Sequence, residues 1–255
     1  MPMRPLIVAL EGPSGAGKTT VARAAGRAFG WEVLPEAFDR LAPARSLVFA
    51  GPAELLAIER DLLADERRRY RRALAVRRGG RTVLADTGFF GPVTYTAGLV
   101  ALGLAPRRVL EQLIEEADRT EGSGPLGVAD AIVYLDVPEP ALRRRVANDP
   151  VGHPGALASR HLAVHRFERT LYRERFHEAL AGRVAIVPGS DAPEAVARRV
   201  GVAVRRLSLD RSPRGARRAV LDQIRSAVAT FGRGRPAVSA VTVKKPARSA
   251  RAPPR

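Results

Sequence analysis

The segment Leu6-Ile7-Val8-Ala9-Leu10-Glu11-Gly12-Pro13-Ser14-Gly15-Ala16-Gly17-Lys18-Thr19-Thr20 decides the fold of this chain. Its first five residues are apolar and predict a buried strand. Residues 12–19 match the pattern G-x-x-x-x-G-K-[ST] in full. The residues from Lys18 to Phe29 predict a helix that ends at Gly30. A buried strand, this loop and a helix, in that order, predict a phosphate-binding loop.

The loop residues have predicted roles in holding ATP and Mg²⁺. Glycines let the backbone fold its N–H groups around a β-phosphate, where side chains would obstruct it. Lys18, the single lysine before Lys244, is expected to bridge the β- and γ-phosphates as a catalytic residue, and the Thr19 hydroxyl to bind the metal. The predicted ATP-binding residues are Gly12, Pro13, Ser14, Gly15, Ala16, Gly17, Lys18, Thr19 and Thr20.

A second metal ligand is expected at the end of a neighbouring strand, because phosphoryl transfer needs an acid near the Mg²⁺. Asp86 closes the apolar stretch Arg81–Ala85 and is the first candidate, with a helix cap or turn as its alternative role. Asp136 closes another apolar stretch and ranks second, because Pro138 opens a helix directly after it and capping accounts for the acid.

Strand and helix patterns alternate through the first two hundred residues, which predicts a parallel sheet covered by helices on both faces. No internal repeat is present. The predicted strands span 6–10, 31–34, 82–85, 131–137 and 184–187. The predicted helices span 18–29, 53–77, 92–102, 106–119, a stretch carrying Leu142 and Val146, 160–181 and 192–207.

The charge is concentrated at one end of the chain. The formal net charge is +17, and residues 211–255 carry twelve Arg or Lys against Asp222 alone. The sequence therefore predicts a domain over 1–208 and a basic, largely disordered tail over 209–255, in which 216–231 is the one periodic stretch. Such a tail contacts nucleic acid or another anionic surface, or is a solvated extension without a partner.

Composition excludes several classes of protein. The chain has no cysteine, which excludes disulfides, thiolate metal sites and cysteine nucleophiles and fits a cytoplasmic location. No apolar run approaches the roughly 18 to 20 residues that span a bilayer. The short apolar run at 6–10 enters a Gly-rich loop directly, unlike a signal peptide.

These motifs resemble the thymidylate kinase and deoxynucleoside kinase group of P-loop kinases over roughly residues 4 to 205. The resemblance rests on Glu11–Thr20, on Asp86 at a strand end, and on Tyr134-Leu135-Asp136-Val137-Pro138-Glu139 before an Arg-rich lid. It implies a three-layer P-loop NTPase fold with five parallel strands, like that of nucleoside monophosphate kinases. It also implies ATP-dependent transfer of the γ-phosphoryl group to a nucleoside or nucleoside monophosphate.

The resemblance also implies residues on the acceptor side. Glu36, in Leu34-Pro35-Glu36, corresponds to the family's acid that positions or deprotonates the acceptor hydroxyl, although a surface loop glutamate has the same pattern. On the following helix, Arg67 is preferred over Arg60 as the arginine that contacts the acceptor.

The lid corresponds to residues 143–166, where arginines neutralise charge on the transferring phosphoryl group. Arg144 is the catalytic candidate. Arg145 lies on a neighbouring helix face, and spacing alone does not decide between them. The nearby histidines at 153, 161, 165 and 177 are expected on the surface.

One departure from the family leaves the acceptor open. These kinases follow the strand acid with arginine, whereas here Thr87-Gly88 follows Asp86. The alternatives are a P-loop kinase for a sugar, antibiotic or other hydroxylated metabolite, and an ATPase switch that its basic tail brings to nucleic acid. A homodimer stays open as well.

Overall fold

The computed structural model describes residues 4–37, 49, 51–119, 126–148, 155–180, 182–207 and 216–231. Its centre is a sheet of five parallel strands in the order β2-β3-β1-β4-β5. The predicted parallel sheet is therefore confirmed. The strands are β1 (Ile7–Glu11), β2 (Glu32–Leu34), β3 (Val83–Asp86), β4 (Ala131–Asp136) and β5 (Val184–Pro188).

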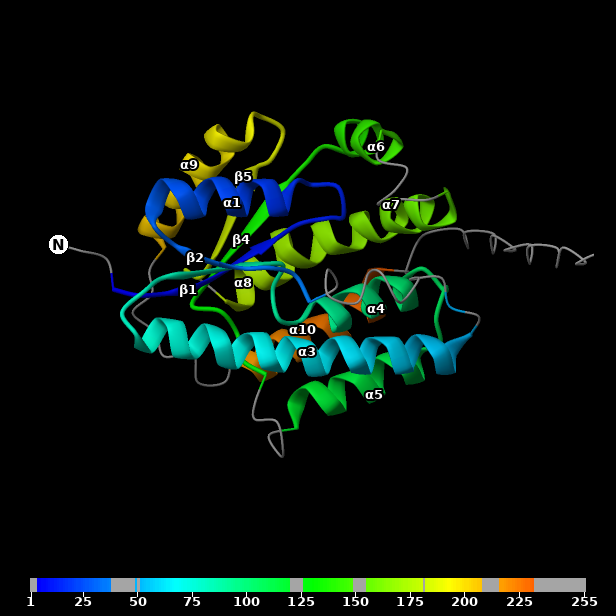
Figure 1. Ribbon diagram of the computed structural model, residues 1–255. Coiled ribbons are helices and arrows are strands. Elements are labelled where there is room, and N and C mark those ends of the chain that lie inside the picture. The colour runs from blue at the N-terminus through cyan, green and yellow to red at the C-terminus, as the bar shows by residue number, and fades with distance from the viewer. Residues whose placement is uncertain are drawn as a thin grey trace, which may run out of the picture.

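Helices cover both faces of the sheet and make three layers (Figure 1). Each face has its own apolar core, and strand β1 is buried along its whole length, as an inner strand of a parallel sheet should be. One face carries α1 (Lys18–Phe29), α6 (Glu139–Ala147) and α9 (Pro193–Arg206). The other carries α3 (Pro52–Arg78), α4 (Gly91–Ala101), α5 (Arg107–Asp118), α7 (Gly155–Thr170) and α10 (Ala216–Phe231).

The strand order sets the position of the phosphate loop. Strand β1 lies between β3 and β4, with Leu10 in register with Asp86 and Glu11 with Tyr134. The carboxyl ends of these strands therefore meet at one edge of the sheet, where the chain leaves β1 through the loop. Ligands of open α/β sheets bind at this kind of edge.

The helix predicted over residues 160–181 begins five residues earlier, at Gly155, and contains a π-helical segment. Helix α7 starts at Gly155, continues as a π-helix, η1 (Leu171–Phe176), and ends as α8 (His177–Ala179). Short π-helical segments inside α-helices occur frequently at functional sites. The segment η1 carries Tyr172 into the core, where its ring stacks on Tyr134 with centroids 4.9 Å apart.

Helix α10 corrects the expectation that the body ends near residue 208. Its residues Val220, Leu221, Ile224 and Ala227 are buried in the same apolar core as α4 and η1. The physical reason is an apolar stripe at helical spacing, which outweighs the basic composition of the segment. Residues 216–231 are thus part of the folded body. The predictions for 209–215 and 232–255 lie outside the described residues.

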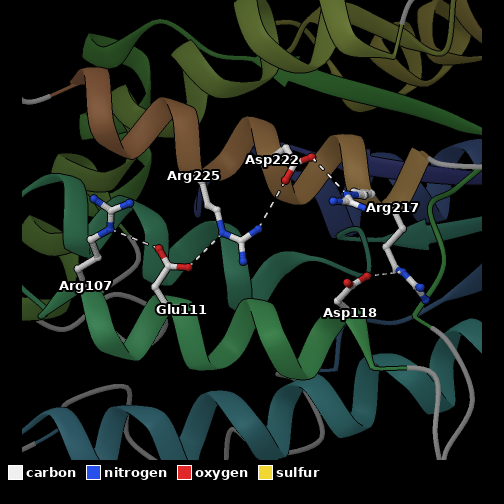
Figure 2. Close-up of polar contacts among 7 residues, drawn as sticks. Arg107, Glu111, Asp118, Arg217, Asp222 and Arg225 are labelled. Carbon is white, nitrogen blue, oxygen red and sulfur yellow. Dashed lines mark hydrogen bonds and ion pairs between the residues drawn. The ribbon is translucent and has the colours of Figure 1, made fainter.

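Polar contacts join α10 to α5 at the edge of this apolar contact (Figure 2). Arg225 donates a hydrogen bond of 3.0 Å to Glu111, which also accepts one from Arg107, and Arg217 pairs with Asp118 at 3.1 Å. These ion pairs are partly exposed, so the buried apolar side chains supply most of the stabilisation.

Within the described ranges, no helix has the length and apolar content needed to cross a bilayer.

Candidate functional site

The phosphate loop needs its glycines for conformational reasons. Gly12, Gly15 and Gly17 have φ angles of 149°, 80° and 88°, in the region that side chains strongly disfavour. Space is also tight at Gly12, because a Cβ there would lie 3.1 Å from the carbonyl oxygen of Leu135. The sequence signal at these positions therefore has a direct backbone cause.

Helix α1 begins at the end of this loop and points its N-terminus at the site. Lys18, its first residue, donates hydrogen bonds from Nζ to the carbonyl oxygens of Gly12 and Pro13, at 3.0 and 3.3 Å. The ammonium group is thus held at the mouth of the loop. Thr19 is half-buried beside it and Thr20 is exposed. An ammonium group, loop amides and a helix N-terminus together favour a bound phosphate.

A cavity of about 170 Å³ opens directly from the loop. It brings together the predicted residues Gly12, Ser14, Lys18 and Glu36. The remaining lining residues are Glu11, Glu59, Leu62, Glu66, Thr87, Gly91, Pro92, Thr94, Tyr95, His161, Val164 and Glu168. Residues predicted for phosphate binding and a residue predicted for the acceptor side therefore share one space.

Glu11, the last residue of β1, is one of the buried acids that line this cavity. Burial raises the pKa of Glu11 to about 7, while hydrogen bonds from the Tyr172 hydroxyl and the Gly88 amide, together with the charge of Lys18, oppose that shift. A Cβ at position 88 would overlap the Glu11 carboxylate, so a larger residue there would displace this side chain. Gly88, the residue after Thr87, thus makes room for Glu11.

Asp86, the predicted metal ligand, ends β3 with 1% of its surface exposed. The next residue, Thr87, has a φ of 66°, an unusual angle for a β-branched side chain, and it lines the cavity. The competing acid Asp136 accepts hydrogen bonds from Arg169 at 2.8 Å and Arg173 at 2.8 Å. Asp136 therefore anchors α7 and η1, which favours Asp86 as the metal-side acid.

Mg²⁺ beside a nucleotide usually takes one or two protein ligands, with phosphate oxygens and water completing its shell. In the described part of the chain, no three acidic or histidine side chains form a metal cluster by themselves. The Thr19 hydroxyl at the start of α1 and the Asp86 carboxylate on the adjoining strand end match the smaller donor set. This donor chemistry fits a metal held jointly with phosphate.

The structure places Arg67, the α3 arginine predicted to contact the acceptor, away from the cavity. Arg67 donates hydrogen bonds to the carbonyl oxygens of Glu116 and Arg119, and Arg60 pairs with Glu116, so both face α5. Neither lines the cavity. The physical reason is helical phase, because these two positions lie on the face of α3 that packs against α5.

Arg69 is the α3 arginine that contacts the end of β3. Its side chain is 1% exposed and pairs with Glu66 at 2.5 Å. It also donates hydrogen bonds to the carbonyl oxygens of Asp86 and Thr87, at 2.8 and 3.2 Å. An arginine thus stands at the end of β3 even though none follows Asp86 in the sequence.

The arginines of the predicted lid divide between several partners. Arg145 donates hydrogen bonds to the carbonyl oxygens of Ala16 and Gly189, at 2.9 and 3.0 Å, whereas Arg144 is exposed. Arg143 and Arg166 both bind Glu139, and they lower its pKa to about 2. Arg145 is therefore the arginine of α6 that touches the phosphate loop.

Several lining residues were not predicted from the sequence. Glu59 and Glu66 come from α3, Tyr95 from α4, and Glu168 from α7. Two histidines expected on the surface are placed differently, because His161 lines the cavity and His165 is buried. His177 is exposed as predicted, and His153 lies outside the described residues.

Comparison with known proteins supports the fold. Residues 7–121, less than half of the chain, match a family model described as an AAA domain. Curated protein sequences give no match to the chain.

Solved structures of deoxyadenosine kinase from M. mycoides are similar to this chain. The structure with the products dCMP and a flexible dCDP has a TM-score of 0.58 at 13% identity, over 78% of this chain and 98% of that one. The structure with dATP gives 0.58 at 13% identity, over 78% and 99% of the two chains. The structure with dCTP gives 0.56 at 11% identity, over 78% and 98%. At these identities the likeness concerns the fold, and the resemblance to the deoxynucleoside kinase group of P-loop proteins is confirmed at that level.

Proposed function

We propose that this chain transfers the γ-phosphoryl group of ATP to a hydroxyl group of a small acceptor of the nucleoside class. The observation that carries the proposal is the shared cavity, in which Lys18 of the phosphate loop and Glu36 of the loop after β2 line the same space. Direct transfer requires the donor phosphate and the acceptor hydroxyl to meet in one water-poor site. The similarity to deoxyadenosine kinase structures supports the same reading.

On the donor side, the loop amides and Lys18 bind the β- and γ-phosphates. The helix α1 N-terminus adds its partial positive charge. Thr19 and Asp86 are the residues that would hold Mg²⁺, which supplies charge neutralisation across the β- and γ-phosphates when bound. Arg145 keeps the loop in shape through the Ala16 carbonyl group.

On the acceptor side, Glu36 receives the proton of the acceptor hydroxyl as that oxygen bonds to the γ-phosphorus. The bond between the γ-phosphorus and the bridging oxygen of ADP breaks in the same transfer, and ADP leaves. Arg144 is exposed on α6 and is proposed to add positive charge to the transferring group. Glu11 supports the site through its contacts with Gly88 and Tyr172.

The test is acceptor-dependent turnover by the purified full-length chain. ATP with radioactive γ-phosphate is incubated with Mg²⁺ and a panel of nucleosides, and labelled products are separated by chromatography. A labelled nucleoside monophosphate is the expected product, and Lys18→Ala should abolish its formation. ATP hydrolysis stimulated by DNA or RNA, without transfer to any small acceptor, would overturn the proposal in favour of an ATPase switch.

A further inference from the structure

The cavity beside the phosphate loop is strongly acidic. Within the described part of the chain its lining holds five carboxylates, while Lys18 is the single lysine or arginine among the lining residues. The five are Glu11, Glu36, Glu59, Glu66 and Glu168. A cavity with so many acids and one lysine offers little positive charge to an acceptor phosphate, and a cation bound there would favour the ionised form of the buried acids.

Two of these five acids contact other groups of the protein. Glu66 forms a buried ion pair with Arg69, and Glu11 accepts hydrogen bonds from Tyr172 and from the Gly88 amide. Lys18 faces the phosphate loop and is committed to the donor. None of these contacts involves Glu59.

Glu59 is the acid without a partner at that end. Only 1% of its surface is exposed, and neither carboxyl oxygen accepts a hydrogen bond from any described residue. Burial alone raises the pKa of Glu59 to about 8. A buried carboxyl group that the protein leaves unsatisfied needs an explanation, and a bound ligand provides one.

Glu59 shares the cavity with residues of three helices. They are Leu62 on α3, Tyr95 on α4, and His161 and Val164 on α7. The rings of Tyr95 and His161 lie 5.7 Å apart. The nearby cation Arg160 lies over the Phe49 ring at 4.5 Å and influences the pKa of Tyr95, and it does not bond to Glu59.

Glu59 lies away from the phosphate loop. It precedes Glu66 by seven residues on α3, which is about 10 Å along a helix. Glu66 is within electrostatic range of Glu11 and Glu36, next to the loop, whereas burial accounts for the whole pKa shift of Glu59. A small acceptor can therefore offer its hydroxyl to Glu36 and a different group to Glu59.

We propose that the acceptor carries a protonated amine and no phosphate, and that Glu59 binds the ammonium group at the end of the cavity remote from the phosphate loop. An ammonium group has three N–H donors, which satisfy both oxygens of Glu59 at once. Glu168 also lines the cavity, but it lies within electrostatic range of Lys18 and Glu11, beside the phosphate loop. This proposal rests on the proposed phosphotransferase function, which it narrows to amine-bearing acceptors.

Two matched sets of acceptors test the proposal in the full-length chain. The first pairs 5-aminomethyl-2′-deoxyuridine with thymidine, and the second pairs glucosamine with N-acetylglucosamine. In at least one set the amine should have a kcat/KM at least about tenfold higher. In Glu59→Gln this preference should fall to about onefold, and Glu59→Asp should keep part of it. Thymidine monophosphate should not be phosphorylated.

The control is Glu115→Gln, an exposed glutamate on α5 whose replacement should leave the preference intact. Neutral acceptors used equally well in both sets, or a preference that survives Glu59→Gln, would overturn the proposal. If no acceptor is phosphorylated, calorimetry with Mg²⁺ and a non-hydrolysable ATP analogue decides separately. If an amine binds to the wild type but not to Glu59→Gln, the amine site is supported although the proposed phosphotransferase function is refuted. If no amine binds, both proposals are refuted.

Discussion

The guanidinium group of Arg145 donates a hydrogen bond of 2.9 Å to the carbonyl oxygen of Ala16, 129 residues away in the chain. A second hydrogen bond, of 3.0 Å, joins Arg145 to the carbonyl oxygen of Gly189 after β5. One side chain of α6 thus links the phosphate loop to the far half of the sheet. Its neighbour Arg144 is exposed on the same helix.

The two neighbouring arginines should affect different quantities. Arg145→Ala removes a charged hydrogen bond to the loop, so we expect the Kd for ATP to rise about tenfold. Arg144→Ala should leave the Kd for ATP unchanged and lower kcat by about tenfold, because its proposed role is confined to the transition state. Calorimetry and steady-state kinetics measure the two effects. Equal losses of ATP affinity in both variants would contradict this division.

A second pair on α3 should differ in stability. Arg69→Met leaves the Glu66 carboxylate buried without its ion pair, and such losses cost about 3–5 kcal/mol. Arg67→Ala removes partly exposed contacts with α5 and should cost about 1 kcal/mol or less. Urea unfolding measures both changes. An Arg69→Met variant as stable as Arg67→Ala would show that the buried pair contributes little.

The different surroundings of Arg67 and Arg69 illustrate which features the sequence could predict and which it could not. The strand and loop around residues 6–20 were predictable because an apolar run and glycines with positive φ angles have few alternative structures. Helix α3 was predictable as an element, but its six arginines from residue 67 to residue 77 differ only in helical phase. Following the buried stripe from Leu55 through Leu62 and Glu66 leads to Arg69 and passes over Arg67.

The same stripe carried a second signal, because Glu59 occupies an apolar-face position of α3. An acid inside such a stripe indicates a buried carboxyl group. No local pattern, in contrast, predicts that η1 becomes a π-helix and turns Tyr172 toward Glu11. That contact depends on the packing of segments far apart in the sequence.

Replacing Glu36 tests the proposed proton acceptor. Glu36→Gln keeps the size of the side chain and removes its basicity, so we expect kcat to fall by about 10² or more. The KM for ATP should stay within about twofold, because Glu36 does not bind the donor in the proposed mechanism. Glu115→Gln serves as the exposed control. An unchanged kcat with a raised acceptor KM would assign Glu36 to positioning the acceptor.

The buried Glu59 predicts a pH-dependent stability. Its pKa is raised from 4.5 to about 8, so the folded chain keeps a proton that the unfolded chain loses between these values. Stability should therefore fall as the pH rises through this window. Glu59→Gln is uncharged at every pH, and at pH 8.5 it should melt about 5–10 °C higher relative to wild type than at pH 5.

Melting curves from pH 5 to 8.5 measure this difference. Burial also raises the pKa of Glu11 and Glu168 to about 7 and that of Glu66 to about 8, but these acids are present in both proteins and cancel in the comparison. A constant difference between Glu59→Gln and wild type across the range would mean that Glu59 has an ordinary pKa.

Helix α10 gives the last prediction, which separates apolar packing from charge. Ile224 is fully buried in the core, so Ile224→Ala should cost about 2–5 kcal/mol, whereas Arg225→Ala removes partly exposed ion pairs and should cost about 1 kcal/mol or less.

Ending the chain after Leu207 should abolish folding or lower the melting temperature by more than about 10 °C, because the whole apolar stripe is lost. Ending it after Phe231 should change the melting temperature by less than about 2 °C, since α10 is then complete. If the chain that ends at Leu207 melts like the full-length protein, the basic charge of this segment is a better guide to its role than the apolar stripe.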